Sequence, residues 1–458
     1  MSPAAQASLS RLEEIVGAEH VLIDGEVRAA RAVDGLTPSA VVRPADAAQG
    51  AEVVRFAAAA KLAVIPSGSG TKLGIGAPPS RYDLALDLSR MNHILAYDPR
   101  DLTLGVEPGV RIADLLRTLA EQKQFLPLAV PFADRATLGG IAAANSSSPL
   151  RHAFGGVRDF CLGMEFSTGN GTASKSGGRV VKNVSGYDLH KLLIGSLGTL
   201  GVITRVNFRT FPLPPAQKTF VASFESAEAA FALCRSIARS PLELVIVEVA
   251  DPVASAIVFS ARGKVQPAPK NWLVIATAAG QAPVVGRHAR DLARLAVETG
   301  AVEFFTLEDA EQSSALEQVR EFPRLAAQSS AYAAIFRINA LPTAMSRLAI
   351  TVAEVAARHG LRSATMARAA GIHYAALLSS PDDAAAVEHL THAAREVFEL
   401  CAAPEIAARA MLEWCPTELK RAVSVWGAPR EDFPLMARMK KVFDPSGILA
   451  PGRFAGGL

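Results

Sequence analysis

The spacing of apolar residues predicts alternating strands and helices in the first quarter of the chain. Residues 11–22 (RLEEIVGAEHVL) begin with a short helix. Residues 40–65 predict a strand, a turn, a helix and a second strand, and residues 82–110 predict two or three further strands. The second strand runs directly into residues 66–76 (PSGSGTKLGIG), so we expect a glycine-rich loop at the end of a strand.

Helical spacing returns in residues 111–124. Four apolar residues lie there at positions i, i+3, i+4 and i+7 and form one face: Ile112, Leu115, Leu116 and Leu119. Small residues then dominate residues 136–148 (ATLGGIAAANSSS), which predicts a second loop. Residues 197–211 predict a glycine turn followed by an alternating strand.

The character of the chain changes after a proline-rich stretch at residues 212–217 (PLPPAQ), which is typical of a domain boundary. Residues 218–400 alternate alanine-rich helices with short apolar strands, such as residues 242–250 (LELVIVEVA). The sequence therefore predicts at least two parts with different organisation, as the length of 458 residues also suggests.

Composition excludes several classes of protein. The net charge of +3 is small for this length, and no dense run of Lys or Arg predicts a nucleic-acid partner. The four cysteines are far apart and form no C-x-x-C pair, which favours reduced, buried thiols over disulfides, zinc or an iron–sulfur cluster. The N-terminus lacks a signal-peptide pattern, and no apolar run reaches the ~18 residues that span a membrane.

Two common nucleotide-binding motifs do not fit the glycine-rich loop. Gly68 and Gly70 match the start of the dinucleotide fingerprint G-x-G-x-x-G, but Gly74 lies one residue too late. Pro78-Pro79 also prevents the helix that this fingerprint must open. A Walker A loop needs Gly-Lys-Ser/Thr, whereas this chain has Thr71-Lys72.

A third arrangement fits the loop: a nest of backbone N–H groups around an anion, with little side-chain obstruction. Ser67, Ser69 and Thr71 add hydroxyl groups at alternate positions. Taken by itself, the stretch is also compatible with a flexible surface loop. Residues 137–145 (TLGGIAAAN) leave a similar choice between a wall that faces a ligand and the tightly packed start of a helix.

Four segments, taken in order, resemble the FAD-binding domain of the vanillyl-alcohol oxidase (PCMH-type) flavoprotein family. They are residues 66–76, residues 86–110 (LDLSRMNHILAYDPRDLTLGVEPGV), residues 131–145 (PFADRATLGGIAAAN) and residues 195–212 (GSLGTLGVITRVNFRTFP). The resemblance covers about residues 35–215, and residues 440–454 (KKVFDPSGILAPGRF) are similar to the family's C-terminal segment.

This resemblance implies an α+β fold in three parts. A two-lobed PCMH-type FAD-binding domain would span residues 1–215. An α/β cap domain with an antiparallel sheet would span residues 216–410. Residues 411–458 would form a C-terminal segment that packs back on the FAD-binding domain.

Two further runs resemble a group within that family, the FAD-binding (E) subunits of bacterial glycolate oxidases. They are residues 151–166 (RHAFGGVRDFCLGMEF) and residues 176–201 (SGGRVVKNVSGYDLHKLLIGSLGTLG). The resemblance implies oxidation of a 2-hydroxy acid, glycolate to glyoxylate, beside a second flavoprotein subunit and an iron–sulfur subunit that takes the electrons. It also implies a cytoplasmic protein, either free or peripheral on the inner face of the membrane through its complex.

The family pattern assigns FAD contacts to three segments. The first loop would wrap the diphosphate, the second segment would lie near the diphosphate and ribityl chain, and the start of the strand after residue 200 would meet the flavin or adenine. The residues so implied are Pro66, Ser67, Gly68, Ser69, Gly70, Thr71, Lys72, Pro131, Thr137, Leu138, Gly139, Gly140, Asn145, Gly201, Val202 and Ile203.

We expect the FAD to be non-covalent. Some relatives attach flavin to a histidine in the first loop, but Thr71 takes that position here and residues 62–76 contain no histidine. Cys161 is a second candidate for attachment, and its apolar neighbours predict instead a buried residue of a strand.

Oxidation of a 2-hydroxy acid needs a cation for the carboxylate and a base near the hydroxyl group. Arg158, Arg179 and Lys182 are candidate cations and His152 is a candidate base, although an ordinary surface role explains each one at least as well. Asp188 more plausibly begins a helix, with its charge near the helix dipole.

No metal site is predicted. His389 and His392 are three residues apart on a predicted helix but lack a carboxylate motif, and they are expected on a solvated face. Two alternatives to the complex subunit stay open: a stand-alone FAD oxidase or dehydrogenase of another hydroxy acid or alcohol, and a structural subunit that has lost its flavin. The intact glycine-rich loops argue against the second alternative.

Overall fold

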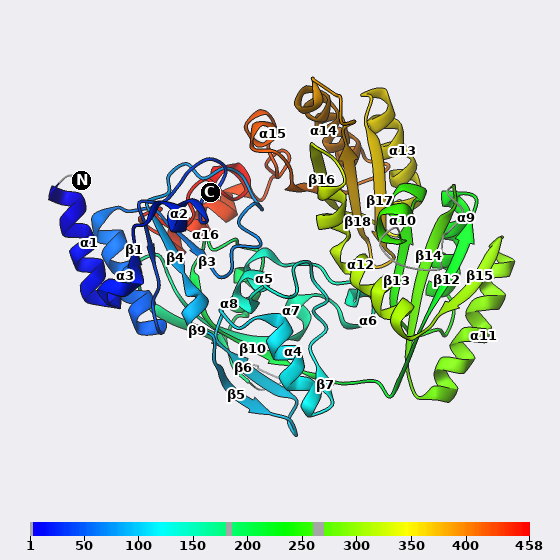
Figure 1. Cartoon of the computed structure of the whole chain (residues 1–458), viewed down its shortest axis with the longest axis horizontal. Coiled ribbons are helices and arrows are strands. Elements are labelled where there is room, and N and C mark those ends of the chain that lie inside the picture. Colours follow the sequence, from blue (N-terminus) through cyan, green and yellow to red (C-terminus); the bar gives the residue numbers. More distant parts are fainter. Residues whose placement is uncertain (1–2, 180–185, 260–269) are drawn as a thin grey trace. The chain divides into compact units, whose positions relative to one another are not determined.

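The computed structural model describes residues 3–179, 186–259 and 270–458. Within these residues the chain forms two compact units, each with its own sheets and core (Figure 1). Unit 1 comprises Met1–Ser146, Gly156–Leu213 and Ala428–Leu458. Unit 2 comprises Ser147–Gly155 and Pro214–Gly427.

The first sheet of unit 1 has four strands in the order β1-β2-β4-β3. β2 and β3 both run parallel to β4, and β1 pairs antiparallel with β2. Helix α3, capped by Asp46, packs its apolar side chains against this sheet. The bounds are β1 Val21–Leu22, β2 Ala40–Val42, α3 Ala47–Ala60, β3 Val64–Ser67 and β4 Leu84–Asp87.

The second sheet of unit 1 is antiparallel, with the strand order β5-β6-β10-β8-β9. Helix α4 buries Ile112, Leu115 and Leu119 in the same core as this sheet, which confirms the predicted apolar face, and Leu116 is partly buried beside them. The bounds are β5 Ile94–Asp98, β6 Thr103–Val106, α4 Ile112–Glu121, β8 Cys161–Ser167, β9 Ala173–Gly177 and β10 Val202–Arg209.

The structure corrects the prediction of a second loop in residues 136–148. Residues Leu138–Ala144 form helix α5, whose apolar residues Leu138 and Ile141 are buried in the core of unit 1. Alanine is the best helix former, and burial of this face compensates for the two glycines in the first turn.

Short elements complete unit 1. They are α1 Pro3–Val16, η1 Ala18–His20, α2 Gly25–Ala29, η2 Leu88–Arg90, β7 Gln124–Phe125, α7 Val157–Phe160, α8 Leu189–Leu193, β11 Phe211–Pro212, α16 Phe433–Phe443 and η3 Ala455–Gly457. Because α16 and η3 follow the whole of unit 2 in sequence, unit 1 is completed by the two ends of the chain.

Unit 2 contains one antiparallel sheet of eight strands, in the order β15-β12-β14-β13-β17-β18-β16-β19, as expected for the cap. Its strands are β12 Ala216–Phe224, β13 Leu244–Ala250, β14 Trp272–Gly280, β15 Glu303–Leu307, β16 Ala333–Asn339, β17 Arg362–Arg368, β18 Ile372–Leu378 and β19 Arg409–Trp414. Its helices are α6 Arg151–Phe154, α9 Ala227–Ala238, α10 Pro252–Phe259, α11 Ala282–Glu298, α12 Asp309–Gln328, α13 Met345–Arg358, α14 Ala386–Ala402 and α15 Thr417–Ala422.

Helices cover both faces of this sheet, which explains why its strands are continuous apolar runs (Figure 1). On β12, Phe220 and Phe224 face a core shared with α9, α11 and α13. Val221 follows Phe220 and points to the opposite face of the sheet, where it lies in a second core shared with α10 and α12. The sheet is thus a central layer rather than a solvent-facing one.

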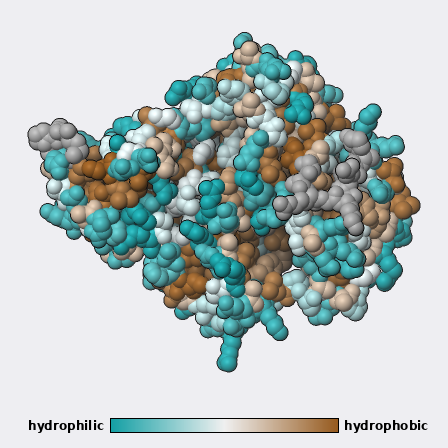
Figure 2. Space-filling view, viewed as in Figure 1, coloured by the Kyte–Doolittle hydropathy of each residue, from teal (hydrophilic) through white to brown (hydrophobic). Residues whose placement is uncertain are grey.

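The outer surface is mixed. Figure 2 shows hydrophilic residues over much of the face in view, interrupted by separate hydrophobic groups. In residues 3–179, 186–259 and 270–458, no helix combines the length and the apolar character needed to cross a bilayer.

Candidate cofactor site

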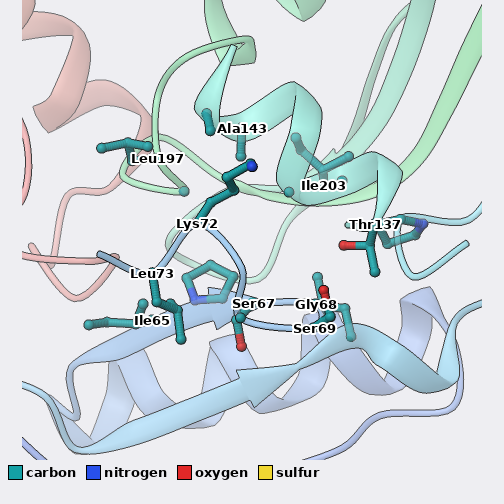
Figure 3. Close-up of a pocket in the computed structure, with 18 of the residues that line it drawn as sticks. Ile65, Ser67, Gly68, Ser69, Lys72, Leu73, Thr137, Ala143, Leu197 and Ile203 are labelled. Carbon is teal, nitrogen blue, oxygen red and sulfur yellow. The ribbon is translucent and has the colours of Figure 1, made fainter. Parts of the chain in front are cut away.

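A pocket in unit 1 is formed where the glycine-rich loop, helix α5 and the segment before β10 meet (Figure 3). It contains about 740 Å³ of space free of atoms, part of which is open to solvent. Its walls are formed by Ile65, Pro66, Ser67, Gly68, Ser69, Gly70, Thr71, Lys72, Leu73, Leu88, Pro108, Thr137, Gly139, Gly140, Ala143, Ala144, Leu197, Gly198, Gly201, Ile203 and Arg453.

The glycine-rich loop is held at both its strand and its turn. β3 pairs in parallel with β4, so Ser67 lies opposite Asp87 and the loop begins at the carboxyl end of both strands. Arg31 fixes the next residue, because its Nη1 donates to the carbonyl oxygen of Gly68 at 2.7 Å and its Nη2 to Asp87 at 2.7 Å. The loop therefore has a defined backbone before any ligand arrives.

The loop approaches the start of helix α5 so closely that only glycine fits at residue 68. A Cβ atom there would lie 2.1 Å from Thr137 Oγ1, far inside van der Waals contact. Figure 3 shows Thr137 beside the loop residues Gly68 and Ser69. The two glycine-containing segments thus form adjoining walls of one pocket.

Two hydroxyl groups in this pocket lack partners in the described part of the chain. The Oγ atoms of Ser67 and Ser69 are buried and make no hydrogen bond. Buried hydroxyl groups are normally paired, so these two point to a bound group with acceptor oxygens. The diphosphate of FAD has such oxygens, and the residues present fit it.

Positive charge also surrounds the pocket. Lys72 Nζ donates to the carbonyl oxygen of Pro131 at 3.1 Å and lies 5.0 Å from the centre of the Phe132 ring. Arg453 is 2% exposed, and burial lowers its pKa to about 10, which keeps the guanidinium charged at neutral pH. An anionic ligand is favoured in such a field.

The structure brings most of the predicted FAD contacts together. Those that line the pocket are Pro66, Ser67, Gly68, Ser69, Gly70, Thr71, Lys72, Thr137, Gly139, Gly140, Gly201 and Ile203. Four others do not line it. Leu138 and Val202 belong to the apolar core, Asn145 is the left-handed C-cap of α5, and Pro131 holds Lys72.

Sequence reasoning missed several residues of the pocket wall. Three of the residues that were not predicted are Leu197, Gly198 and Arg453. Leu197 and Gly198 lie within residues 195–212, which resemble the family, and Arg453 lies in the similar C-terminal segment. Because all three lie in segments that resemble the family, the resemblance could have suggested them as pocket residues. Leu88 and Pro108, which follow the ends of β4 and β6, also line the pocket and lie within residues 86–110, another segment that resembles the family.

The candidate catalytic residues do not gather at this pocket. Arg158 is exposed on α7, and Arg179 lines a separate depression with Lys175 and Arg205. His152 belongs to α6 in unit 2, where burial lowers its pKa and its buried Nδ1 makes no hydrogen bond to the residues that the structure describes. Lys182 lies outside the described residues.

Two predictions outside the pocket agree with the structure, those for Asp188 and Cys161. Asp188 precedes helix α8 as its N-cap residue and pairs with Lys191 at 2.8 Å. Cys161 is buried in β8, and burial raises its pKa to about 12, which makes its thiol unreactive. On α14, His389 is half-buried beside Asp383 and His392 is exposed, and in the described ranges no three His, Cys, Asp or Glu side chains form a metal-binding group.

Unit 2 contains a buried ionic group that sequence reasoning did not select. Arg368 Nε donates to Glu248 Oε1 at 3.1 Å, and Arg368 Nη1 contacts Ser147 Oγ. Glu248 is fully buried, and its Oε2 has no hydrogen-bond partner within the described ranges. Burial raises its pKa to about 7 against the opposing effect of Arg368. A charged residue inside an apolar strand, as in residues 242–250, is the signal that could have found it.

Comparison with known proteins identifies the family. Residues 38–177 match the family model described as "FAD binding domain", and residues 213–405 and 420–454 match the one described as "FAD linked oxidases, C-terminal domain". The chain belongs to this family of FAD-linked oxidases. It is an oxidoreductase with a PCMH-type FAD-binding fold, which confirms the resemblance drawn from its sequence.

Individual relatives agree with this assignment. The chain is 26% identical over 418 residues to the glycolate oxidase subunit GlcD of Bacillus subtilis (strain 168), covering 91% of this chain and 88% of that protein. It is 36% identical over 166 residues to the glycolate oxidase subunit GlcE of Escherichia coli (strain K12), covering 36% of this chain and 47% of that protein. The solved 4-ethylphenol oxidase of Gulosibacter chungangensis shares the fold, with a TM-score of 0.79 at 18% identity over 99% of this chain and 97% of that one.

The contact between Gly68 and Thr137 generates a first prediction. Gly68→Ala places a methyl group against Thr137, forces the two walls apart and should lower FAD affinity about tenfold or more. Thr137→Ala in the same chain removes the closest atoms and should restore part of that affinity. Equilibrium FAD titration of the apoprotein measures both. Gly25→Ala, where an added Cβ meets no atom within 4 Å, is the matched control. Equal affinities in all variants would contradict the assignment of this wall.

The unpartnered hydroxyl groups generate a second prediction. Ser67→Ala and Ser69→Ala should each raise the Kd for FAD about tenfold, the size expected for a hydrogen bond to a charged acceptor. The melting temperature of the apoprotein should not fall, because these hydroxyl groups make no bond in the described chain. Ser39→Ala, at an exposed position, serves as control. A loss of apoprotein stability without a loss of affinity would reject the proposed contact.

The buried ionic group of unit 2 generates a third prediction. The folded-state pKa of Glu248 is raised from 4.5 to about 7, so its contribution to stability is present below pH 4.5 and is lost as the pH rises through 7. The difference amounts to roughly 3 kcal/mol. Glu248→Gln should therefore reduce the pH dependence of unfolding between pH 5 and pH 8, measured by hydrogen exchange in β13 and β17.

A residual pH dependence is expected in the Glu248→Gln variant, because burial also raises the pKa of Asp251 to about 7. Glu303→Gln changes an exposed glutamate of the same sheet and should leave the pH dependence as it is in the wild type. Identical pH profiles for wild type and Glu248→Gln would show that Glu248 is ionised in the folded state over this range.

Proposed function

We propose that this protein carries out FAD-dependent oxidation of a 2-hydroxy acid, glycolate to glyoxylate, as the FAD-binding subunit of a multi-subunit glycolate oxidase. The observation that carries the proposal is the pocket with two unpartnered hydroxyl groups in a chain of the FAD-linked oxidase family. Two relatives named as glycolate oxidase subunits support the choice of substrate.

In this proposal residues 1–215 form the FAD-binding domain, residues 216–410 the cap, and residues 411–458 the returning C-terminal segment. The glycine-rich loop and the start of α5 would hold the diphosphate through backbone N–H groups and the hydroxyl groups of Ser67 and Ser69. Bound FAD would supply the redox chemistry by accepting the hydride that the substrate loses from its hydroxyl-bearing carbon. Attachment would be non-covalent, since Thr71 offers no imidazole.

The substrate's proton needs a base, and His152 has the protonation state that a base requires. Burial lowers its pKa, so the imidazole is neutral at pH 7, and among the described residues its Nδ1 has no hydrogen-bond partner. Arg158 and Arg179 remain candidates for the substrate carboxylate, with Lys182 outside the described residues. A surface role stays the alternative for each of them.

Electrons must leave the reduced flavin, and in the described residues no three His, Cys, Asp or Glu side chains gather into a group that could hold a metal ion. Its four cysteines, Cys161, Cys234, Cys401 and Cys415, lie at separate positions of the fold. A second flavoprotein subunit and an iron–sulfur subunit would receive the electrons in the proposed complex. A cytoplasmic position, peripheral at the inner face of the membrane, would suit such an assembly.

A stand-alone FAD oxidase or dehydrogenase is the second candidate function. The match to GlcD covers 91% of this chain and 88% of that protein, so the likeness extends over both units and includes the part with the eight-stranded sheet. In this case the electron acceptor would be a small molecule, and the substrate another hydroxy acid or alcohol.

Anaerobic reduction by glycolate separates these functions. The chain is purified alone, its visible spectrum is taken, one sample is denatured with acid and another receives glycolate. A yellow protein that releases its flavin in acid and is bleached by glycolate only after its partners are added supports the proposed subunit. Rapid bleaching of the chain alone supports the stand-alone enzyme, and a colourless protein that FAD cannot reconstitute refutes both.

A further inference from the structure

The last segment of the chain contributes Arg453 to the wall of the cofactor pocket, although this residue is far in sequence from the other residues of the wall. We name residues 433–458, which comprise helix α16, the turn after it and η3, the C-terminal clasp. Directly before the glycine-rich loop, Val64 N donates to Ile448 O at 2.8 Å and Ala450 N donates to Val64 O at 2.8 Å. The clasp thus continues the sheet at β3, the strand from which the loop begins.

Lys440 is a buried cation of the clasp with three acceptors. It is 8% exposed, and its Nζ donates to Asp444 Oδ2 at 2.7 Å, to Thr199 O at 2.8 Å and to Leu449 O at 2.8 Å. Thr199 lies in the segment 197–201, of which Leu197, Gly198 and Gly201 line the pocket. Lys440 therefore ties α16 and the turn after it to one wall of the cofactor site.

Arg453 makes the corresponding link to the other wall. Its Nη2 donates to Leu73 O at 2.6 Å and also contacts Ile75 O, so it holds the exit of the glycine-rich loop. The backbone adds to this link, because Ala77 N donates to Arg453 O at 3.0 Å. Arg453 also lines the pocket itself, which places its charge where the diphosphate is assigned.

Helix α16 is attached both by apolar packing of Phe443 in the core of unit 1 and by the polar bonds of Lys440. A largely apolar cavity lies between α16 and residues 192–200. It has about 800 Å³ of space free of atoms, part of it open to solvent. Its walls include Leu192, Leu200, Leu435, Met436, Met439 and Phe454. Where apolar packing is incomplete, the directional bonds of Lys440 contribute more to holding the segments in place.

We propose that the C-terminal clasp and FAD bind cooperatively, with Lys440 and Arg453 as positioning residues that hold the two walls in the shape that FAD requires. The inference rests on the assignment of the pocket to FAD. Binding energies are reciprocal: if the docked clasp raises FAD affinity, bound FAD strengthens the docking of the clasp by the same factor. Arg453 adds a second effect, because its buried charge favours the anionic diphosphate.

FAD titration of variants tests the clasp. Lys440→Met and Arg453→Met should each raise the Kd for FAD about tenfold or more, a typical size for coupling between two sites. Lys441→Met, which removes the exposed lysine next to Lys440 on the same helix, should leave the Kd unchanged. Arg453→Lys retains the charge and should keep the salt dependence of FAD binding, whereas Arg453→Met should reduce it. A merely structural loss would not alter the salt dependence.

Hydrogen exchange of the wild-type chain provides a measurement that needs no variant. FAD should slow the exchange of backbone amides in residues 444–453 and in residues 197–201 together. Unchanged exchange of residues 444–453 on FAD binding, or wild-type affinity in Lys440→Met and Arg453→Met, would overturn the clasp while leaving the FAD site intact. A wild-type chain that does not bind FAD would overturn the pocket assignment, and with it this inference.

Discussion

The contact between the glycine-rich loop and the start of helix α5 is the constraint on which the cofactor site depends. Because a Cβ at Gly68 would lie 2.1 Å from Thr137 Oγ1, the two segments meet only if residue 68 has no side chain. Gly68 is placed by the parallel pairing of β3 with β4 and by Arg31. Thr137 is placed by its antiparallel bridge to Arg111 and by the bond from Leu138 N to Val110 O at 2.9 Å. This contact is thus one of the places where the elements of the two sheets of unit 1 meet.

Features set by neighbours in sequence could be predicted. The apolar face of α4, the strand before the glycine-rich loop and the helix start at Asp188 all follow from local spacing and capping, and the structure contains each of them. The prediction of a second loop in residues 136–148 was wrong for a related reason. Its glycines and serines favour a loop in isolation, whereas burial of Leu138 and Ile141 stabilises a helix.

Features set by partners distant in sequence could not be predicted. Arg453 contacts carbonyl oxygens 380 and 378 residues earlier in the chain, and Arg368 pairs with Glu248 across 120 residues. No local pattern records such pairings, nor the order in which eight strands join one sheet. Family resemblance supplied the walls of the pocket, but it gave no reason to connect the C-terminal segment to a particular loop carbonyl.

The evidence for the cofactor and the evidence for the substrate come from different parts of the chain. A nest of backbone N–H groups and hydroxyl groups satisfies a diphosphate whatever the flavin oxidises, so the pocket identifies the cofactor class and not the substrate. Substrate choice requires a cation and a base beside the reacting carbon, and Arg158 and Arg179 do not line the pocket. The same flavin site therefore suits both a complete dehydrogenase and a subunit that passes electrons to partners. What distinguishes these two proteins must lie in residues outside the pocket.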